Sequence, residues 1–130
     1  MNATRQMIHT DRAPSAVGTY SQAIKVGKMV FISGQIPLDP ETMQLVSNEI
    51  DKQIYRVFDS LEAICHESGG HLDDIVKLTI YLTDLTHYKL VNDIMETYFY
   101  SPFPARAAVQ VSALPKGSAI EIDAILVLPD

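Results

Sequence analysis

One apolar face, running from residue 50 to residue 65, limits the fold more than any other feature of this sequence. Its apolar side chains follow the three- and four-residue spacing of an α-helix. They are Ile50, Ile54, Val57, Phe58, Leu61, Ile64 and Cys65. The pattern predicts a helix that begins near Ser47 or Asn48 and ends at Gly69 and Gly70, because glycine readily adopts the left-handed conformation that closes a helix. A helix with one apolar face needs a second layer to cover that face.

Segments with the two-residue alternation of β-strands surround this helix. Residues 75–82 predict a strand whose side chains divide between two faces. Val76, Leu78, Ile80 and Leu82 lie on one face, and Ile75, Lys77, Thr79 and Tyr81 lie on the other. Before the helix, "QMIH", "SQAIKV" and "KMVFISGQI" predict three strands, the last two joined by a turn at Gly27-Lys28. After it, "ARAAVQVSAL" and "AIEIDAILVL" predict two strands around residues 114–117.

A second helix is predicted from about Thr86 to Ser101-Pro102, where proline ends it. Its apolar side holds Tyr88, Val91, Ile94, Met95, Tyr98 and Phe99. The resulting order, βββαβαββ, predicts an α+β fold in which a mixed sheet of about six strands carries both helices on one face.

The last predicted strand has two unlike faces. Ile120, Ile122, Ala124, Leu126 and Leu128 form an apolar face that suits the helices. Ala119, Glu121, Asp123, Ile125 and Val127 form the opposite face, which mixes apolar and acidic side chains. Such a surface suits contact with another subunit better than contact with water. We therefore expect a homo-oligomer.

Length and composition predict a single domain that spans residues 1–130. The chain is 47% hydrophobic and 20% charged, which is typical of globular domains. Cys65 is the only cysteine, so no internal disulfide can form, which fits a reducing compartment. The stretch "MNATRQMIHTDRAP" lacks the apolar core of a signal peptide, and "AILVL" is too short to cross a bilayer. These observations predict a cytoplasmic location.

Charge and motif content argue against several classes of partner and cofactor. The formal net charge is −6 and the basic residues are scattered, which disfavours binding of nucleic acid. The histidines show no metal-ligand spacing, and Cys65 lies on the core side of the first helix. No glycine-rich phosphate loop is present, since Gly69-Gly70 follows a helix instead of opening one. We expect neither a metal nor a cofactor.

The segment "PARAAV" places Arg106 among small apolar residues in a predicted strand. A buried guanidinium is costly unless an anion accompanies it. Composition alone favours a structural ion pair between Arg106 and Glu121. In the alternative interpretation, Ala108 on the same face leaves room for a small carboxylic acid, which Arg106 binds while Glu121 acts as a general base or holds a water molecule.

The spacing of Arg106 and Glu121 limits both interpretations. In a tight hairpin closed by residues 114–117, Arg106 lies opposite Ile125, and Glu121 is roughly 13 Å further along the strand. The two side chains then do not converge. Either these strands are not direct neighbours in a hairpin, or another subunit completes the pocket.

Four other residues are candidates for lining such a pocket. Tyr20 and Ser33 can hold a water molecule, and Gly34 can give a ligand access to backbone N–H groups. Asn92 lies near the apolar side of the second helix. Taken alone, each is a weak signal, and Tyr20 and Asn92 are better explained by local packing or hydrogen bonding.

Longer stretches of the sequence resemble a known family. They are "APSAVGTYSQAI", "VFISGQIPLDPETM", "DIVKLTIYLTDL" and "FPARAAVQVSALPKGSAIEIDAI". Over essentially the full chain, and most specifically in "SGQIP" followed by "PAR", "LP" and "EI", the sequence is similar to the reactive-intermediate deaminase family, RidA, also called YjgF. The resemblance implies a chorismate-mutase-like α+β fold and a homotrimer with a ligand cleft at each subunit interface.

The resemblance also implies an activity and a site. Such proteins hydrolyse 2-aminoacrylate or 2-aminocrotonate, or their imine tautomers, to a 2-keto acid and ammonia, and pyridoxal phosphate belongs only to the upstream enzymes. Arg106 matches the family arginine that binds the substrate carboxylate, and Glu121 matches the glutamate that activates or orients water. The positions that match the rest of the cleft are Tyr20, Ser33, Gly34, Asn92 and the backbone at Ala108.

Two residues depart from the usual family pattern. Thr19 stands where proline is common, which leaves the loop before Tyr20 without a fixed φ. Ala108 stands where cysteine is frequent, so hydrolysis here rests on arginine, glutamate and water. Two other functions remain as alternatives: a regulatory protein that binds small carboxylates without turnover, and an endoribonuclease or translation inhibitor.

Overall fold

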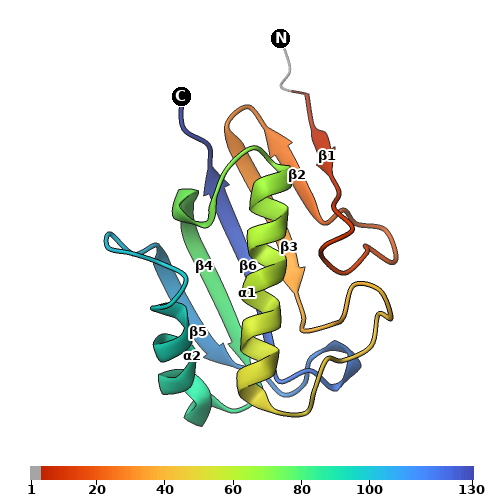
Figure 1. The fold of residues 1–130 in the computed structure, drawn as a ribbon, viewed down its shortest axis with the longest axis vertical. Coiled ribbons are helices and arrows are strands. Elements are labelled where there is room, and N and C mark those ends of the chain that lie inside the picture. Colours follow the sequence, from red (N-terminus) through yellow and green to blue (C-terminus); the bar gives the residue numbers. More distant parts are fainter. Residues whose placement is uncertain (1–3) are drawn as a thin grey trace.

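The computed structural model describes residues 4–130, so the first three residues of the N-terminal stretch lie outside it. Its strands are β1 (Gln6–Ile8), β2 (Ala23–Val26), β3 (Met29–Gln35), β4 (Ile75–Leu82), β5 (Ala105–Gln110) and β6 (Ile120–Val127), and its α-helices are α1 (Ile50–Glu67) and α2 (Tyr88–Met95). The strands form one six-stranded sheet in the order β1-β2-β3-β6-β4-β5, and both helices cover the same face of it (Figure 1). The predicted α+β fold is confirmed.

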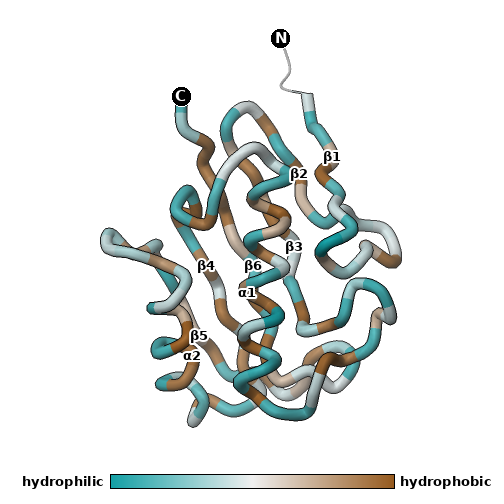
Figure 2. Tube along the Cα trace, in the orientation of Figure 1, coloured by the Kyte–Doolittle hydropathy of each residue, from teal (hydrophilic) through white to brown (hydrophobic). Residues whose placement is uncertain are grey.

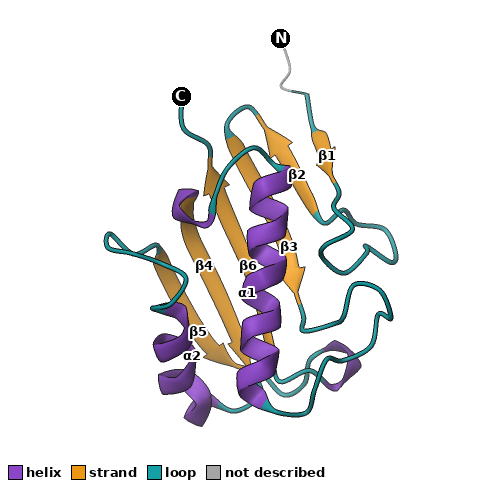
Figure 3. Ribbon diagram, in the orientation of Figure 1, coloured by secondary structure: helices purple, strands orange, loops and turns teal. Residues whose placement is uncertain are grey.

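Strand β4 separates the last two strands of the chain (Figure 3). It pairs antiparallel with β6 and parallel with β5. The segment between β5 and β6 passes the end of β4, where Val111 donates its backbone N–H to Leu82 and Ala119 accepts one from Thr83. The segments "ARAAVQVSAL" and "AIEIDAILVL" therefore do not form a hairpin, as the first of the two alternatives above required.

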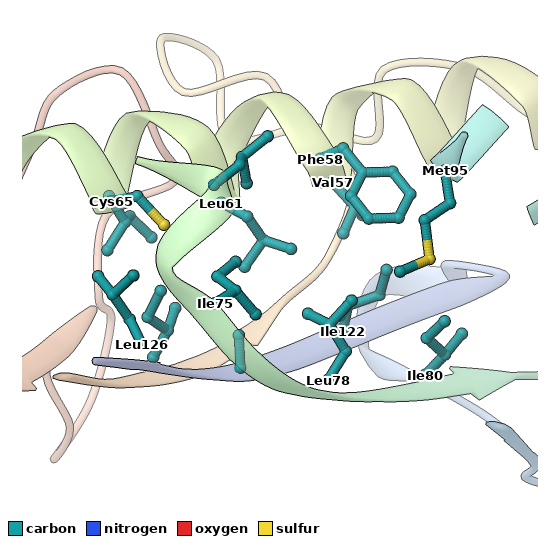
Figure 4. Close-up of a cluster of buried hydrophobic side chains, with 14 of the residues drawn as sticks. Val57, Phe58, Leu61, Cys65, Ile75, Leu78, Ile80, Met95, Ile122 and Leu126 are labelled. Atoms are coloured by element: carbon teal, nitrogen blue, oxygen red, sulfur yellow. The ribbon is translucent and has the colours of Figure 1, made fainter. Parts of the chain in front are cut away.

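The buried face of α1 is the predicted one. Figure 4 shows Val57, Phe58, Leu61 and Cys65 of the helix against Ile75, Leu78, Ile80, Ile122 and Leu126 of the sheet. Hydrophobic positions recur along β4 and β6 behind the helix (Figure 2). Full burial of a large aliphatic or aromatic side chain contributes about 1.5–3 kcal/mol. This layer therefore holds the sheet in the register that positions the site.

The alternation predicted for residues 75–82 is wrong at its start. Ile75 is buried, whereas Val76 is 46% exposed. Ile75 pairs with Leu126 and Lys77 pairs with Ile125, so Val76 is an extra residue in β4. Such a β-bulge shifts the faces of the strand by one residue. From Leu78 onward the predicted core face is correct.

Both helices are shorter than the sequence predicts. α1 begins at Ile50, and before it the Ser47 hydroxyl accepts the backbone N–H of Glu49, a local turn that competes with helical bonding. α2 ends at Met95, where Thr97 donates both its backbone N–H and its hydroxyl to the Ile94 carbonyl. Gly69, at φ +96°, closes α1 as predicted. Neither helix within residues 4–130 has the length and hydropathy that crossing a bilayer requires.

Candidate functional site

Arg106 lies in β5 under helix α2, and neutral groups hold its guanidinium. Its Nη1 donates to Asn92 Oδ1 at 2.5 Å, and its Nη2 donates to the Tyr88 hydroxyl at 2.6 Å. The Tyr88 ring also lies over the guanidinium, with its centroid 5.1 Å from Cζ, a cation–π arrangement. Both contacts come from one face of α2, where Tyr88 is exposed and Asn92 is half-buried. They fix the orientation of Arg106 without cancelling its charge.

No carboxylate of the described residues lies within 4.0 Å of the Arg106 guanidinium. Within one chain, Arg106 and Glu121 therefore do not form the structural ion pair that composition favoured. Beside Arg106 is a cavity of about 410 Å³ whose wall includes Asn92, Met95 and Phe103. Arginine presents paired N–H donors that match a carboxylate or a phosphate. The Arg106 guanidinium therefore offers an anion a binding group in this cavity, whose wall also includes the Glu96 carboxylate.

Glu121 lies in β6 on the opposite face of the sheet. It pairs with Tyr81 of β4, whereas Arg106 pairs with the buried Leu78 below the helices. A second cavity, of about 530 Å³, is lined by Glu121 together with Tyr20, Ser33 and Gly34. β4 lies between the two strands, which separates them by roughly 10 Å across the sheet. Within one chain the two predicted catalytic residues do not meet.

The environment of Glu121 favours its protonated form. Burial raises the pKa of the Glu121 carboxyl above its ordinary value, and the negative charge of Asp123 raises that pKa further. Asp123 accepts a hydrogen bond from the Tyr81 hydroxyl at 3.1 Å. A carboxyl group with a raised pKa accepts and returns protons more readily near neutral pH than an ordinary glutamate does.

The hydroxyl groups of the second cavity have defined orientations. Ser33 donates its hydroxyl proton to the Ser21 carbonyl at 2.6 Å, so the lone pairs of Ser33 Oγ remain able to accept. The Tyr20 hydroxyl accepts the backbone N–H of Val17 at 3.2 Å, which leaves its own proton able to donate. The cavity thus offers an acceptor, a donor and a carboxyl group to a small polar molecule.

The seven predicted site residues fall into two groups. Arg106 and Asn92 share the first cavity, while Tyr20, Ser33, Gly34 and Glu121 share the second. Ala108 packs against the core two residues after Arg106 and lines neither cavity.

Sequence reasoning missed Tyr88, which it placed on the apolar side of its helix. In the structure Tyr88 is 40% exposed and contacts Arg106. Its position four residues before Asn92 was the available signal, because residues at that spacing share one face of a helix. Cys65, by contrast, is buried, which raises the pKa of its thiol to about 12 and leaves it inert. Among residues 4–130, no group of three or more His, Cys, Asp and Glu side chains is arranged to hold a metal ion.

Comparison with known proteins identifies the family of this chain. Residues 10–128 match the family model described as Endoribonuclease L-PSP. The human protein named 2-iminobutanoate/2-iminopropanoate deaminase is 44% identical over 123 residues, covering 95% of this chain and 90% of that protein.

Solved structures of similar proteins have the same fold as this chain. The crystal structure of RidA from the Antarctic bacterium Psychrobacter sp. PAMC 21119 superposes with a TM-score of 0.91 at 51% identity, covering 95% of this chain and 99% of that one. Escherichia coli TdcF with bound serine superposes with a TM-score of 0.89 at 35% identity, covering 95% and 99% of the two chains. The sequence match, the shared sheet and the matching motifs lead to one conclusion: this chain belongs to the RidA/YjgF family.

Proposed function

We propose that the protein hydrolyses small 2-imino acids, such as 2-iminobutanoate and 2-iminopropanoate, to the corresponding 2-keto acids and ammonia. The observation that carries the proposal is the Arg106 guanidinium, which is held in place by neutral groups and has no carboxylate partner among residues 4–130. A substrate carboxylate supplies the missing anion. The similarity to a human protein named for this activity supports the same choice.

We further propose that the site forms between subunits of a homotrimer, each a single domain of residues 1–130. The Arg106 cavity of one subunit then meets the Glu121 cavity of its neighbour. The outer face of the sheet supports this assembly, because Met29, Phe31 and Val127 are 42%, 44% and 38% exposed there. These side chains lie on paired strands and form a continuous apolar surface, which is typical of an interface.

In the proposed reaction, Arg106 binds the carboxylate and Glu121 moves protons. Water adds its oxygen to C2 of the imine while the imine nitrogen gains a proton, which gives a carbinolamine. The carbinolamine hydroxyl then gives its proton to Glu121, which passes it to the amine nitrogen as the C–N bond breaks, the C=O bond forms and ammonia leaves. Glu121 carries the proton in both steps, for which its raised pKa is suited. Such hydrolysis needs positioning more than a covalent nucleophile.

The remaining site residues have supporting roles in this proposal. Asn92 orients the guanidinium through its 2.5 Å contact. Ser33 accepts a hydrogen bond from the attacking water, and Tyr20 donates one to the substrate. Gly34 gives the substrate access to backbone N–H groups, and the backbone at Ala108, which lines neither cavity within one chain, contacts it only in the assembled trimer of this proposal.

The decisive variant is Arg106→Ala, with the exposed Arg5→Ala as the matched control. A serine dehydratase generates 2-aminoacrylate in situ, and its loss is followed with and without the protein. We expect Arg106→Ala to abolish the acceleration and to elute as wild type in size-exclusion chromatography, whereas Arg5→Ala remains fully active. An Arg106→Ala variant as fast as wild type contradicts the proposed role.

Two other functions have an observation in their favour. The serine in the TdcF crystal fits a protein that binds small carboxylates without turnover, and this alternative predicts saturable binding with no acceleration of imine loss. The description of the matching family model fits an endoribonuclease. The net charge of −6 opposes RNA binding. RNA cleavage that is sensitive to salt and absent in Glu121→Ala would favour the endoribonuclease.

A further inference from the structure

Gly34 has no conformational reason to be glycine. The glycines with left-handed φ values are Gly18, Gly27, Gly69 and Gly117, and Gly34 is not among them. Alanine therefore fits the backbone at position 34 without strain. Some other physical requirement has to explain the absence of a side chain there.

The requirement is the space occupied by Glu121. A Cβ atom placed on Gly34 would lie 2.4 Å from Glu121 Oε2, 2.8 Å from its Cδ and 3.1 Å from its Cγ. All three distances are shorter than ordinary van der Waals contact between such atoms. The acid end of Glu121 rests directly against the bare Cα of Gly34.

A bulge in β3 brings this Cα to Glu121. Ile32 pairs with Ala124 and Gln35 pairs with Ile122, so β3 uses one residue more than β6 over this interval. The extra residue lies at Ser33-Gly34, beside Glu121. Bulges of this kind redirect side chains and often stand next to active sites. Here the bulge places Ser33 and Gly34 together on the wall of the second cavity.

We propose that Gly34 is a positioning residue for Glu121: the missing side chain leaves the pocket in which the reactive carboxylate lies. The inference rests on the proposed function, because it assigns Glu121 the proton transfers of imine hydrolysis. It gives Gly34 a role distinct from substrate access. The atoms that would collide belong to the end of a flexible side chain, so a methyl group at position 34 turns Glu121 away and leaves the backbone in place.

The kinetic test compares Gly34→Ala, Glu121→Ala and the double variant. A misplacement of about 1 Å can reduce a catalysed rate by roughly 100-fold, so we expect kcat of Gly34→Ala to fall by about that factor. KM stays near the wild-type value, because Arg106 holds the carboxylate on the other half of the site. In the Glu121→Ala background the same substitution has no further effect on kcat, since no carboxylate is left to displace.

Gly27→Ala is the matched control. Gly27 has φ +60° and nothing within 4 Å of a Cβ placed on it, so alanine there lowers the melting temperature but leaves kcat unchanged. Gly34→Ala should show the reverse, a nearly unchanged melting temperature with a reduced kcat. A Gly34→Ala variant with wild-type kcat, or an equal loss of kcat in the Glu121→Ala background, overturns the proposal.

A measurement without substrate separates this inference from the proposed function. The ¹³C NMR signal of the Glu121 carboxyl carbon is titrated in wild type and Gly34→Ala, with the Asp123 carboxyl as the internal reference. The ionisable groups near Glu121 are Asp123 on β6, Tyr81 on β4, and Tyr20 and Lys116 in the cavity wall. We expect Gly34→Ala to lower the pKa of Glu121 toward its ordinary value and to leave Asp123 nearly unchanged. A Glu121 titration identical to wild type refutes the positioning role even if the protein hydrolyses no imine.

Discussion

The two charged residues of the candidate site face opposite requirements. In the proposed reaction Arg106 stays charged, and its hydrogen bonds to Tyr88 and Asn92 orient the guanidinium. Glu121 has to change its charge during the proposed reaction, and its surroundings favour the neutral form. Within one chain, strand β4 separates the two residues, so neither neutralises the other there. The same two residues in direct contact would form an inert ion pair.

The raised pKa of Glu121 predicts a pH dependence. The ionised carboxylate is the base, so kcat/KM falls as pH drops through this pKa, at a higher pH than an ordinary glutamate would give. The same shift affects stability. Protonation of Glu121 is favoured in the folded state. The protonated carboxyl therefore stabilises the folded protein at pH values below the unfolded-state pKa, and this stabilisation is lost as pH rises through the folded-state pKa.

The measurements are a pH–rate profile and urea unfolding at several pH values, with Glu121→Gln as the reference. Glu121→Gln lacks the ionisation, so its stability relative to wild type should rise between acidic and neutral pH. A stability difference that is constant with pH would contradict the shift.

At the scale of elements, side-chain hydrogen bonds connect the layers near the site. Gln53 is buried at 2% exposure in the first turn of α1. Its Oε1 accepts the backbone N–H of Ala119 at 2.8 Å, and its Nε2 donates to the Ser47 carbonyl at 2.9 Å. One amide thereby joins α1, the loop before it and the start of the strand that carries Glu121.

Replacing Gln53 with methionine should destabilise the fold. The substitution keeps the volume but leaves two partly buried backbone groups without partners, and each such loss costs up to about 1–3 kcal/mol. We expect the free energy of unfolding in urea to fall by about 2–4 kcal/mol. The exposed Gln44→Met serves as the control and should change stability by less than about 0.5 kcal/mol. Equal stabilities of the two variants would show that the amide contributes nothing.

Regular hydrophobic spacing made the helices and strands predictable from the sequence. Local irregularities, such as a β-bulge, made the exact faces of the strands harder to predict. The three- and four-residue repeat of α1 identified its buried face, because burial is set by helix geometry. Val76 is an extra residue in β4 and breaks its alternation. The sequence did not reveal this, because valine has the same strand propensity in a bulge as in a regular strand. Family motifs indicated which residues to consider as site residues. Their division between two faces was not predictable, because it depends on β4 inserting between β5 and β6.

At the scale of the whole molecule, the two proposed catalytic residues line separate cavities, which is why we propose a site shared between subunits. Mixing subunits tests this directly. In the proposed function Arg106→Ala abolishes the activity and Glu121→Ala leaves only a small residual rate, and each variant lacks a different half of the site. In randomly reassembled 1:1 trimers, about a quarter of the interfaces should combine two intact halves, given closed cyclic symmetry.

The measurement is imine hydrolysis after unfolding and refolding the two variants together, with separately refolded variants mixed afterwards as the control. We expect recovery of about a quarter of wild-type activity, which follows from the closed ring of identical interfaces. Full inactivity of correctly assembled mixed trimers would place both residues in one subunit's site.

The order of strands also determines when the sheet can form during synthesis on the ribosome. β6 is the last strand to be made, yet it pairs with both β3 and β4. Until residues 120–127 emerge, the group β1-β2-β3 and the group β4-β5 have no strand pairing that joins them. Their apolar surfaces stay exposed for that interval, when nascent chains are most prone to aggregate. The strand that carries Glu121 is thus also the strand that completes the sheet.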